Sequence, residues 1–183
     1  GGGAGSCRGS GSHNVAIGCQ ALLGGSTVSS NTGNCNVALG INAGKGTTSG
    51  AENVFIGPNA GCTNTTAGCS IFIGKGAGEN SNASFNVFLG RYAGYANTTG
   101  CNNIFMGCCA ARSATTGCCN VFIGVRAASS AAVTGNNNLA MGFAAGTQLT
   151  SGYENVMLGK DSSQQNTVGY RNVTIGQGAA QCM

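Results

Sequence analysis

The sequence is dominated by one five-residue pattern, seen as Asn-Val-Phe-Leu-Gly at residues 86–90, which recurs through nearly the whole chain. Ten copies begin at residues 14, 36, 53, 70, 86, 103, 120, 138, 155 and 172, and all but the first step between them are 16 to 18 residues long. A fixed short period indicates that each repeat is one structural unit and that successive units stack. This period constrains the fold more than any other feature of the chain.

We number positions within a repeat from its first residue. Position 5 is Gly in all ten copies, and position 8 is Ala in all but one, where Ser162 stands. The β-branched and aromatic residues of positions 1–4 predict a short strand, and the Gly after it predicts a turn. The Thr-Thr pairs common at positions 13–14 suggest a second short extended piece. Seventeen residues are too few for a helix, a strand and two connections.

We therefore predict an all-β fold, a parallel β-solenoid (β-roll) of about ten 17-residue coils spaced about 4.8 Å apart. Residues 1–183 form a single repeat domain in this prediction. Residues 1–13 are a partial first coil, residues 14–171 full coils and residues 172–183 a partial last coil. The five extra residues between the first two copies lie within residues 23–34 and are expected to bulge outwards. Neither end carries an evident cap, so we also expect either a longer fibre or end-to-end stacking.

The amino-acid composition argues against several classes of function. Only 7% of the 183 residues are charged, and Lys and Arg are scattered along the sequence with a net charge of +4. A nucleic-acid partner is not expected, because it would require clustered Lys and Arg. No apolar run is long enough for a membrane-spanning helix. The eleven Cys favour an oxidising compartment, and hence an extracellular or virion or cell-surface location.

Stacked repeats turn conserved positions into columns. The Asn at position 1 is expected to form a ladder in which each side-chain amide bonds the coils on either side. Its members are Asn36, Asn53, Asn86, Asn103, Asn120, Asn138, Asn155 and Asn172.

The predicted strand is apolar on both faces, because side chains alternate and both sets are hydrophobic. We interpret the position 3 column as an outward association face covered by another chain, since strands apolar on both sides are normally covered on both sides. The alternative is that these rings fill the coil and that Val and Ile of positions 2 and 4 face outwards. The column consists of Phe55, Phe72, Phe88, Phe105 and Phe122.

The Asn-Val-x-Ile-Gly-x-x-Ala-Gly unit resembles the head repeats of trimeric autotransporter adhesins of the Yersinia adhesin type. The full unit, as in residues 86–102 with Asn97-Thr98-Thr99-Gly100, is similar to repeats of phage-type tail fibre proteins. The resemblance covers residues 11–183. It implies a parallel β-roll, trimeric as in the adhesins, with the Val-x-Ile strands near the axis.

Catalytic and metal-binding arrangements are not apparent. His13 is the only His, and Glu52 and Glu154 share position 17 but lie six coils apart, roughly 29 Å. Carboxylate pairs that act together lie within about 10 Å of one another. Cys108-Cys109 and Cys118-Cys119 invite a zinc interpretation, but no His lies near them. We expect no enzyme and no cofactor.

Two adjacent-coil cysteines are the candidate disulfide. Cys101 and Cys118 both occupy position 16, so their Cα atoms are expected about 5 Å apart, within the range for a disulfide. Cys35 and Cys69 share position 17 but are two coils apart, which is too far for a bridge.

Two surface roles remain open for the turns. Asn64, Asn82 and Asn97 fit the acceptor pattern for N-linked glycans, or serve as turn-forming Asn. An outward Thr column would suit an ice-binding face, and its candidates are Thr65, Thr66, Thr98, Thr99, Thr115 and Thr116.

The expected function is that of a non-enzymatic structural repeat protein, a self-associating β-solenoid of an extracellular fibre, filament or adhesin-like head. Its partners are copies of itself, as a trimer or an end-to-end filament. The alternative is an ice-binding (antifreeze) protein that uses the Thr column, and a third possibility is a fibre tip that binds a surface glycan.

Overall fold

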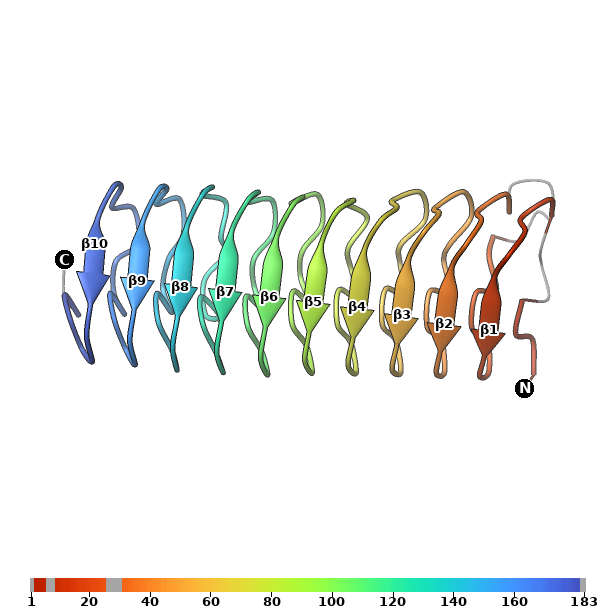
Figure 1. Ribbon diagram of the computed structural model, residues 1–183, viewed down its shortest axis with the longest axis horizontal. Helices are drawn as coiled ribbons and strands as arrows, with labels where there is room; N and C mark the ends of the chain where they lie inside the picture. The colour runs from red at the N-terminus through yellow and green to blue at the C-terminus, as the bar shows by residue number, and fades with distance from the viewer. Residues whose placement is uncertain (1, 6–8, 26–30, 182–183) are drawn as a thin grey trace.

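The computed structural model describes residues 2–5, 9–25 and 31–181 and shows a straight rod of stacked coils with the first and last coils at opposite ends (Figure 1). Each coil contributes one three-residue strand. The strands are β1 (Val15–Ile17), β2 (Val37–Leu39), β3 (Val54–Ile56), β4 (Ile71–Ile73), β5 (Val87–Leu89), β6 (Ile104–Met106), β7 (Val121–Ile123), β8 (Leu139–Met141), β9 (Val156–Leu158) and β10 (Val173–Ile175).

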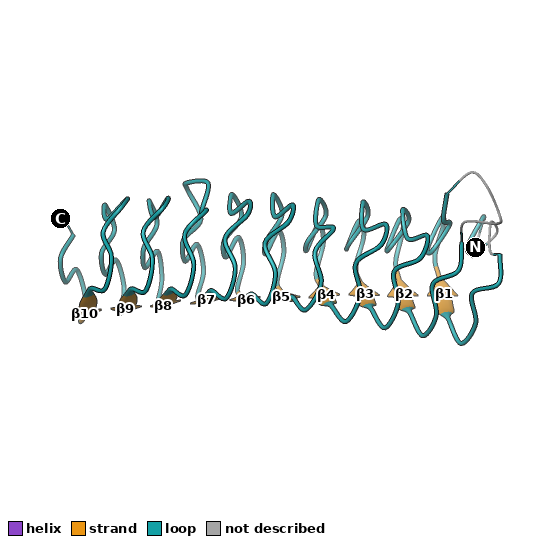
Figure 2. Ribbon diagram, turned by 90° about the horizontal axis from the view of Figure 1, so that it is seen from above, coloured by secondary structure: helices purple, strands orange, loops and turns teal. Residues whose placement is uncertain are grey.

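The ten strands form one parallel sheet in sequence order, and this confirms the predicted β-solenoid. The register follows the repeat, so that Val87 of β5 pairs with Ile104 of β6 and Phe88 pairs with Phe105. Figure 2 shows the strands in a single row along one side of the rod, with turns making up the remainder of every coil. Each residue of a strand therefore lies beside the same position of the next coil.

The second extended piece expected near Thr-Thr does not form a strand in the described part of the chain. Turns and bends occupy that side instead, joined between coils by backbone hydrogen bonds such as Thr98 N–H to the Thr115 carbonyl, 2.9 Å. Most of the small Ala residues at position 8 are buried in one core cluster with the position 3 side chains of the sheet. The bulge expected within residues 23–34 cannot be compared with the structure over residues 26–30, which lie outside the described residues.

The invariant Gly at position 5 is required by the close approach of successive coils. Gly90 adopts a φ of +136°, and a Cβ there would lie 2.5 Å from the carbonyl oxygen of Gly107. Because no other residue adopts this conformation readily and none has room here, any side chain would push the coils apart. The prediction of a Gly turn after each strand is confirmed.

The Phe column lies inside the coils, which corrects our assignment of these rings to the association face. Phe55, Phe72, Phe88, Phe105 and Phe122 are all 0% exposed. The rings of Phe88 and Phe105 stack with centroids 4.7 Å apart and planes 3° from parallel, and those of Phe105 and Phe122 lie 5.3 Å apart. The alternative orientation holds, with Phe filling the core and the aliphatic residues outside.

Residues from other positions fill the core where position 3 is small. Ala38 and Ala140 replace Phe in β2 and β8, and the buried Leu22 and Leu149 belong to the same core cluster. In β10 position 3 is Thr174, whose hydroxyl lies 2.9 Å from Ser162 Oγ and 2.7 Å from Ser163 Oγ. Ser162, the single exception to the Ala column, therefore accompanies the single polar residue of the Phe column.

The Asn ladder is confirmed, and the structure shows how each amide works. Asn103 Oδ1 accepts a hydrogen bond from the backbone N–H of Asn120 at 2.9 Å, while its Nδ2 donates to the carbonyl of Gly117 at 2.8 Å. The oxygen thus joins two coils and the nitrogen closes its own coil. Ser70 replaces Asn at position 1 of one coil, and its Oγ accepts a hydrogen bond from the Asn86 N–H at 3.2 Å.

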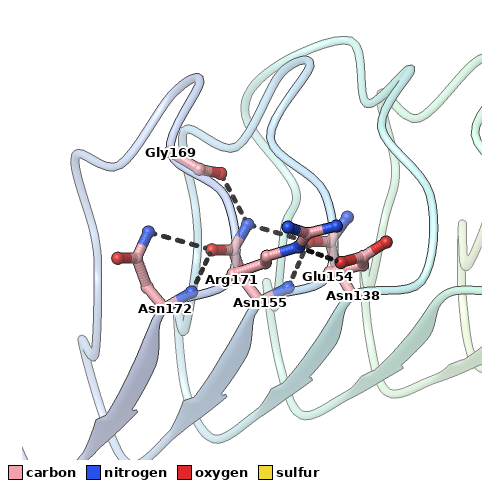
Figure 3. A network of polar contacts seen from close by, with 6 residues as sticks. All are labelled: Asn138, Glu154, Asn155, Gly169, Arg171 and Asn172. Carbon is pink, nitrogen blue, oxygen red and sulfur yellow. Dashed lines mark hydrogen bonds and ion pairs between the residues drawn. The ribbon is translucent and has the colours of Figure 1, made fainter.

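The same arrangement continues to the last coils (Figure 3). Asn172 N–H donates to Asn155 Oδ1 at 3.1 Å, and Asn155 Nδ2 donates to the carbonyl of Gly169 at 2.7 Å. Beside the ladder, at the exposed position 17, Arg171 Nε pairs with Glu154 Oε2 at 2.7 Å. The glutamate raises the pKa of Arg171, mainly through this hydrogen bond.

Candidate association face

Positions 2 and 4 of the repeat are the first and last residues of each strand. Their side chains point out of the coil and are aliphatic in all ten coils. We call these twenty residues the aliphatic strip. They are Val15, Ile17, Val37, Leu39, Val54, Ile56, Ile71, Ile73, Val87, Leu89, Ile104, Met106, Val121, Ile123, Leu139, Met141, Val156, Leu158, Val173 and Ile175. Because the strands are parallel and in register, the two positions form two unbroken rows along the rod.

The exposure of the strip follows from this stacking. Val87, with a neighbouring strand on each side, is partly buried, whereas Val173 and Ile175 of the last strand are both 68% exposed. Packing between coils therefore shields the sides of each side chain and leaves its tip in water.

The exposed area is large for a surface left bare. Nine of the twenty residues are 36–68% exposed and the others are partly exposed. The strip therefore presents on the order of 1,000 Å² of apolar surface, above the roughly 300–600 Å² of the largest patch on a typical monomer. It also matches the roughly 800 Å² that each partner contributes to a standard protein interface. No Lys, Arg, Asp or Glu interrupts either row.

Two of the three predicted glycan acceptors are buried. Asn64 and Asn97 are 0% exposed and face the coil interior at position 12, so a sugar on either amide is incompatible with the folded coil. Asn82 is exposed, and its Oδ1 accepts hydrogen bonds from the backbone N–H groups of Thr65 and Thr66, both at 3.0 Å. The pattern at residues 64 and 97 is thus explained by buried turn-forming Asn.

The Thr column lies on turns, away from the sheet. Thr66, Thr98, Thr99 and Thr116 are exposed, while Thr65 and Thr115 are partly buried. The position 13 hydroxyl bonds the next coil, as in Thr98 Oγ1 donating to the Thr115 carbonyl at 3.2 Å. These hydroxyls therefore help hold the coils together, and Asn82-Ala83 interrupts the column.

The candidate disulfide pair lies in contact. The Sγ atoms of Cys101 and Cys118 are 3.0 Å apart, with both side chains partly buried. Burial raises the pKa of Cys118 above its ordinary value of 9.0. The backbone N–H of Cys101, which donates to Cys118 Sγ at 3.0 Å, partly opposes this rise, and the contact between the two thiols adds to it. Between Cys35 and Cys69 stands Glu52, whose Oε2 accepts from the Cys69 thiol at 3.2 Å and raises its pKa.

The remaining titratable groups lie apart from one another. His13 is exposed near the first strand, and its Nδ1 contacts Ser12 Oγ at 3.0 Å. Within the described ranges, no three His, Cys, Asp or Glu side chains lie close enough together to hold a metal ion. Residues 2–5, 9–25 and 31–181 likewise contain no helix that could cross a membrane.

Positive charge that appears scattered in the sequence gathers on one edge of the rod, which corrects our interpretation of it as dispersed. Six of the eight Lys and Arg occupy positions 6–10, on the turns that follow the strands. They are Lys45, Lys75, Arg91, Arg112, Arg126 and Lys160. The edge becomes apparent when each cation is assigned to its position in the repeat, because these residues are far apart in the sequence.

Comparison of the chain with models of protein families, with curated proteins and with solved structures found no match. The function is therefore inferred from the fold and its surfaces.

Proposed function

We propose that this protein is a non-enzymatic structural rod that associates with two further copies of itself through the aliphatic strip, as part of an extracellular fibre or adhesin-like head. The observation that carries the proposal is the strip itself, two uninterrupted aliphatic rows over ten coils. Hydrophobic burial drives most protein association, and a surface of this size needs a partner.

The shape of the strip favours further copies of the same chain as the partner. The strip is only two side chains wide but roughly 43 Å long, since it spans nine strand-to-strand steps of about 4.8 Å. A second rod of the same chain presents a strip of the same length and coil spacing. A compact globular partner would match only part of it.

The two rows suit a threefold arrangement. Around a threefold axis each rod contacts two neighbours, so the position 2 row packs against one and the position 4 row against the other. The three strips then enclose a common apolar core parallel to the rods. The resemblance of the repeats to trimeric adhesin heads supports the same arrangement, with the Val-x-Ile strands at the axis.

Molar mass in dilute solution, measured by light scattering, tests the proposal. We expect three times the 17.9 kDa of one chain. The variant Val87→Lys/Ile104→Lys places charges in the strip on adjacent coils and is expected to give single chains, because each buried charge would lose its hydration.

The matched control is Thr99→Lys/Thr116→Lys, which adds the same charge to exposed turns of the same two coils. We expect it to keep the trimer mass. A wild-type protein that stays at 17.9 kDa, or a strip variant that associates like the control, would contradict the proposal.

A further inference from the structure

The positively charged edge accounts for the whole net charge of the chain. Besides its six cations, this edge carries Glu79 and Asp161, which leaves +4, the formal charge of the entire sequence. The other charged residues, Arg8, Arg171, Glu52 and Glu154, sum to zero. An anion approaching the rod is therefore attracted to this edge in particular.

Two adjoining hollows lie in the middle of the edge, on the coils of β3 to β7. The first has a volume of about 510 Å³ and is lined by Asn59, Lys75, Glu79, Arg91, Tyr92, Tyr95 and Arg112. The second, of about 360 Å³, is lined by Cys109, Arg112, Ser113, Arg126, Ser129 and Ser130. Arg112 lines both, so the hollows are neighbours along the rod. Volumes of about 300–1,000 Å³ are typical of ligand sites.

Tyr92 holds two of the guanidinium groups in place. The Cζ atoms of Arg91 and Arg112 lie 4.8 and 5.7 Å from the centroid of its ring, in cation–π contact. The ring is itself fixed by Tyr95, which packs edge-on at 88° with centroids 5.5 Å apart. Gly76 makes room for it, because a Cβ there would lie 2.6 Å from the ring. Oriented Arg forks lose less entropy when they bind an oxyanion.

The cations of the hollows are not neutralised by ion pairs. The ion pairs found among the described residues are Arg171–Glu154 and Lys160–Asp161, and neither involves the hollows. Glu79 is the only acid in the two linings, against Lys75, Arg91, Arg112 and Arg126. Planar guanidinium groups bind carboxylate, sulfate or phosphate oxygens in pairs of hydrogen bonds.

We propose that the two hollows form a binding site for an acidic polysaccharide laid along the rod. Arg91, Arg112 and Arg126 come from three successive coils, so cations follow one another along the rod, as a polymer with repeated anionic groups requires. The hydroxyls of Ser113, Ser129 and Ser130 and the amide of Asn59 supply partners for sugar hydroxyl groups.

A nucleic acid fits the same edge less well. Single-stranded nucleic acids bind by stacking their bases on free aromatic faces. Here Tyr92 is already covered by guanidinium groups and by the edge contact with Tyr95. The site lies outside the aliphatic strip, so the proposal does not depend on the proposed function.

Binding to the whole protein is measured by fluorescence anisotropy with labelled polymers. Polygalacturonate supplies carboxylates and dextran sulfate supplies sulfates, so the two arms distinguish the anionic group. Neutral dextran and an oligo-dT strand are the comparison probes. We expect saturable binding of at least one acidic polysaccharide, no binding of dextran, and weaker binding of oligo-dT.

The test variant is Arg91→Gln/Arg112→Gln, and its matched control is Lys45→Gln/Lys160→Gln, which removes two cations from the same edge outside the hollows. Loss of the two guanidinium groups is expected to weaken binding about tenfold or more. The control changes the net charge equally and is expected to weaken binding less than about threefold, as an effect of long-range charge alone.

Two further variants sharpen the assignment, and far-UV circular dichroism checks that each one is folded. Tyr92→Leu leaves the charge unchanged and is expected to weaken binding severalfold, because the guanidinium groups lose their support. Glu79→Gln is expected to strengthen it. Failure of both acidic polysaccharides to bind, equal losses in the test and control variants, or equally tight binding of oligo-dT would overturn the proposal.

Discussion

The aliphatic strip and the charged turn edge use the same repeat in opposite ways. Along the strip, positions 2 and 4 hold aliphatic residues in every coil. Along the edge, position 6 alone runs through Pro58, Lys75, Arg91, Cys108 and Val125 in five successive coils. The strip positions are held fixed because each must match the coil above and below, whereas position 6 lies on the outside of its turn and varies without disturbing the stack. The uniform columns thus stabilise the stack of coils, and the varied columns give each part of the rod a different surface chemistry.

The largest expected effect comes from the buried Phe column. Phe105→Ala removes a buried ring from the middle of the stack and is expected to lower the free energy of unfolding by about 3–5 kcal/mol. Arg112→Ala in the same coil changes an exposed turn residue and should fall within about 0.5 kcal/mol of the wild type. Urea unfolding followed by circular dichroism compares the two. Similar losses would break the distinction between the columns.

A varied position is expected to add stability when oxidised. Oxidised glutathione should convert Cys101 and Cys118 to a disulfide: the two thiols lose two protons and two electrons, and two molecules of reduced glutathione form. Closing this 17-residue loop should raise the unfolding free energy by about 3 kcal/mol. Mass spectrometry detects the loss of two hydrogens, and Cys118→Ser is the control.

The oxidation should also depend on pH in a defined direction. Burial raises the pKa of Cys118, so its thiolate is scarce at neutral pH and increases as the pH rises through and above 9.0. We therefore expect the rate to rise over that range. A rate that is flat with pH, or a bridge that leaves the unfolding midpoint unchanged, would contradict this account.

A smaller loss is expected in the Asn ladder. Asn103→Ala leaves the Asn120 N–H and the Gly117 carbonyl without their partners, which should cost about 2–3 kcal/mol. Asn103→Ser keeps an oxygen for the Asn120 N–H, as Ser70 does for Asn86, and should recover part of the loss. Thermal unfolding measures both, and equal losses would mean that the rung oxygen contributes little.

The period was enough to predict the β-solenoid and the Asn ladder, because both follow from stacking identical positions. The period did not decide which strand face lies inside, since Phe88 and its neighbours Val87 and Leu89 are all apolar. A clue was present in position 3, which ranges from Ala to Phe and to Thr174. Such variation requires compensation by neighbours such as Leu22 and Ser162, and compensation occurs in an enclosed core.

The charged edge was missed for a different physical reason. Lys75 and Arg91 are 16 residues apart in sequence but occupy the same position of adjacent coils. The hollows were beyond sequence reasoning altogether, because they depend on the conformation of Tyr92 and on the space left at Gly76. Two of the three candidate glycan sites are buried, because the acceptor pattern reports residue types and says nothing of whether a residue such as Asn64 faces inwards.

Each strand contacts only the strands immediately before and after it. The length of the rod can therefore change in steps of one repeat. Excising residues 103–119 would bring Asn86 against Asn120 and shorten the rod by about 4.8 Å without altering its cross-section. Duplicating the same segment would lengthen it equally. The span of the rod can thus change through gain or loss of repeats alone.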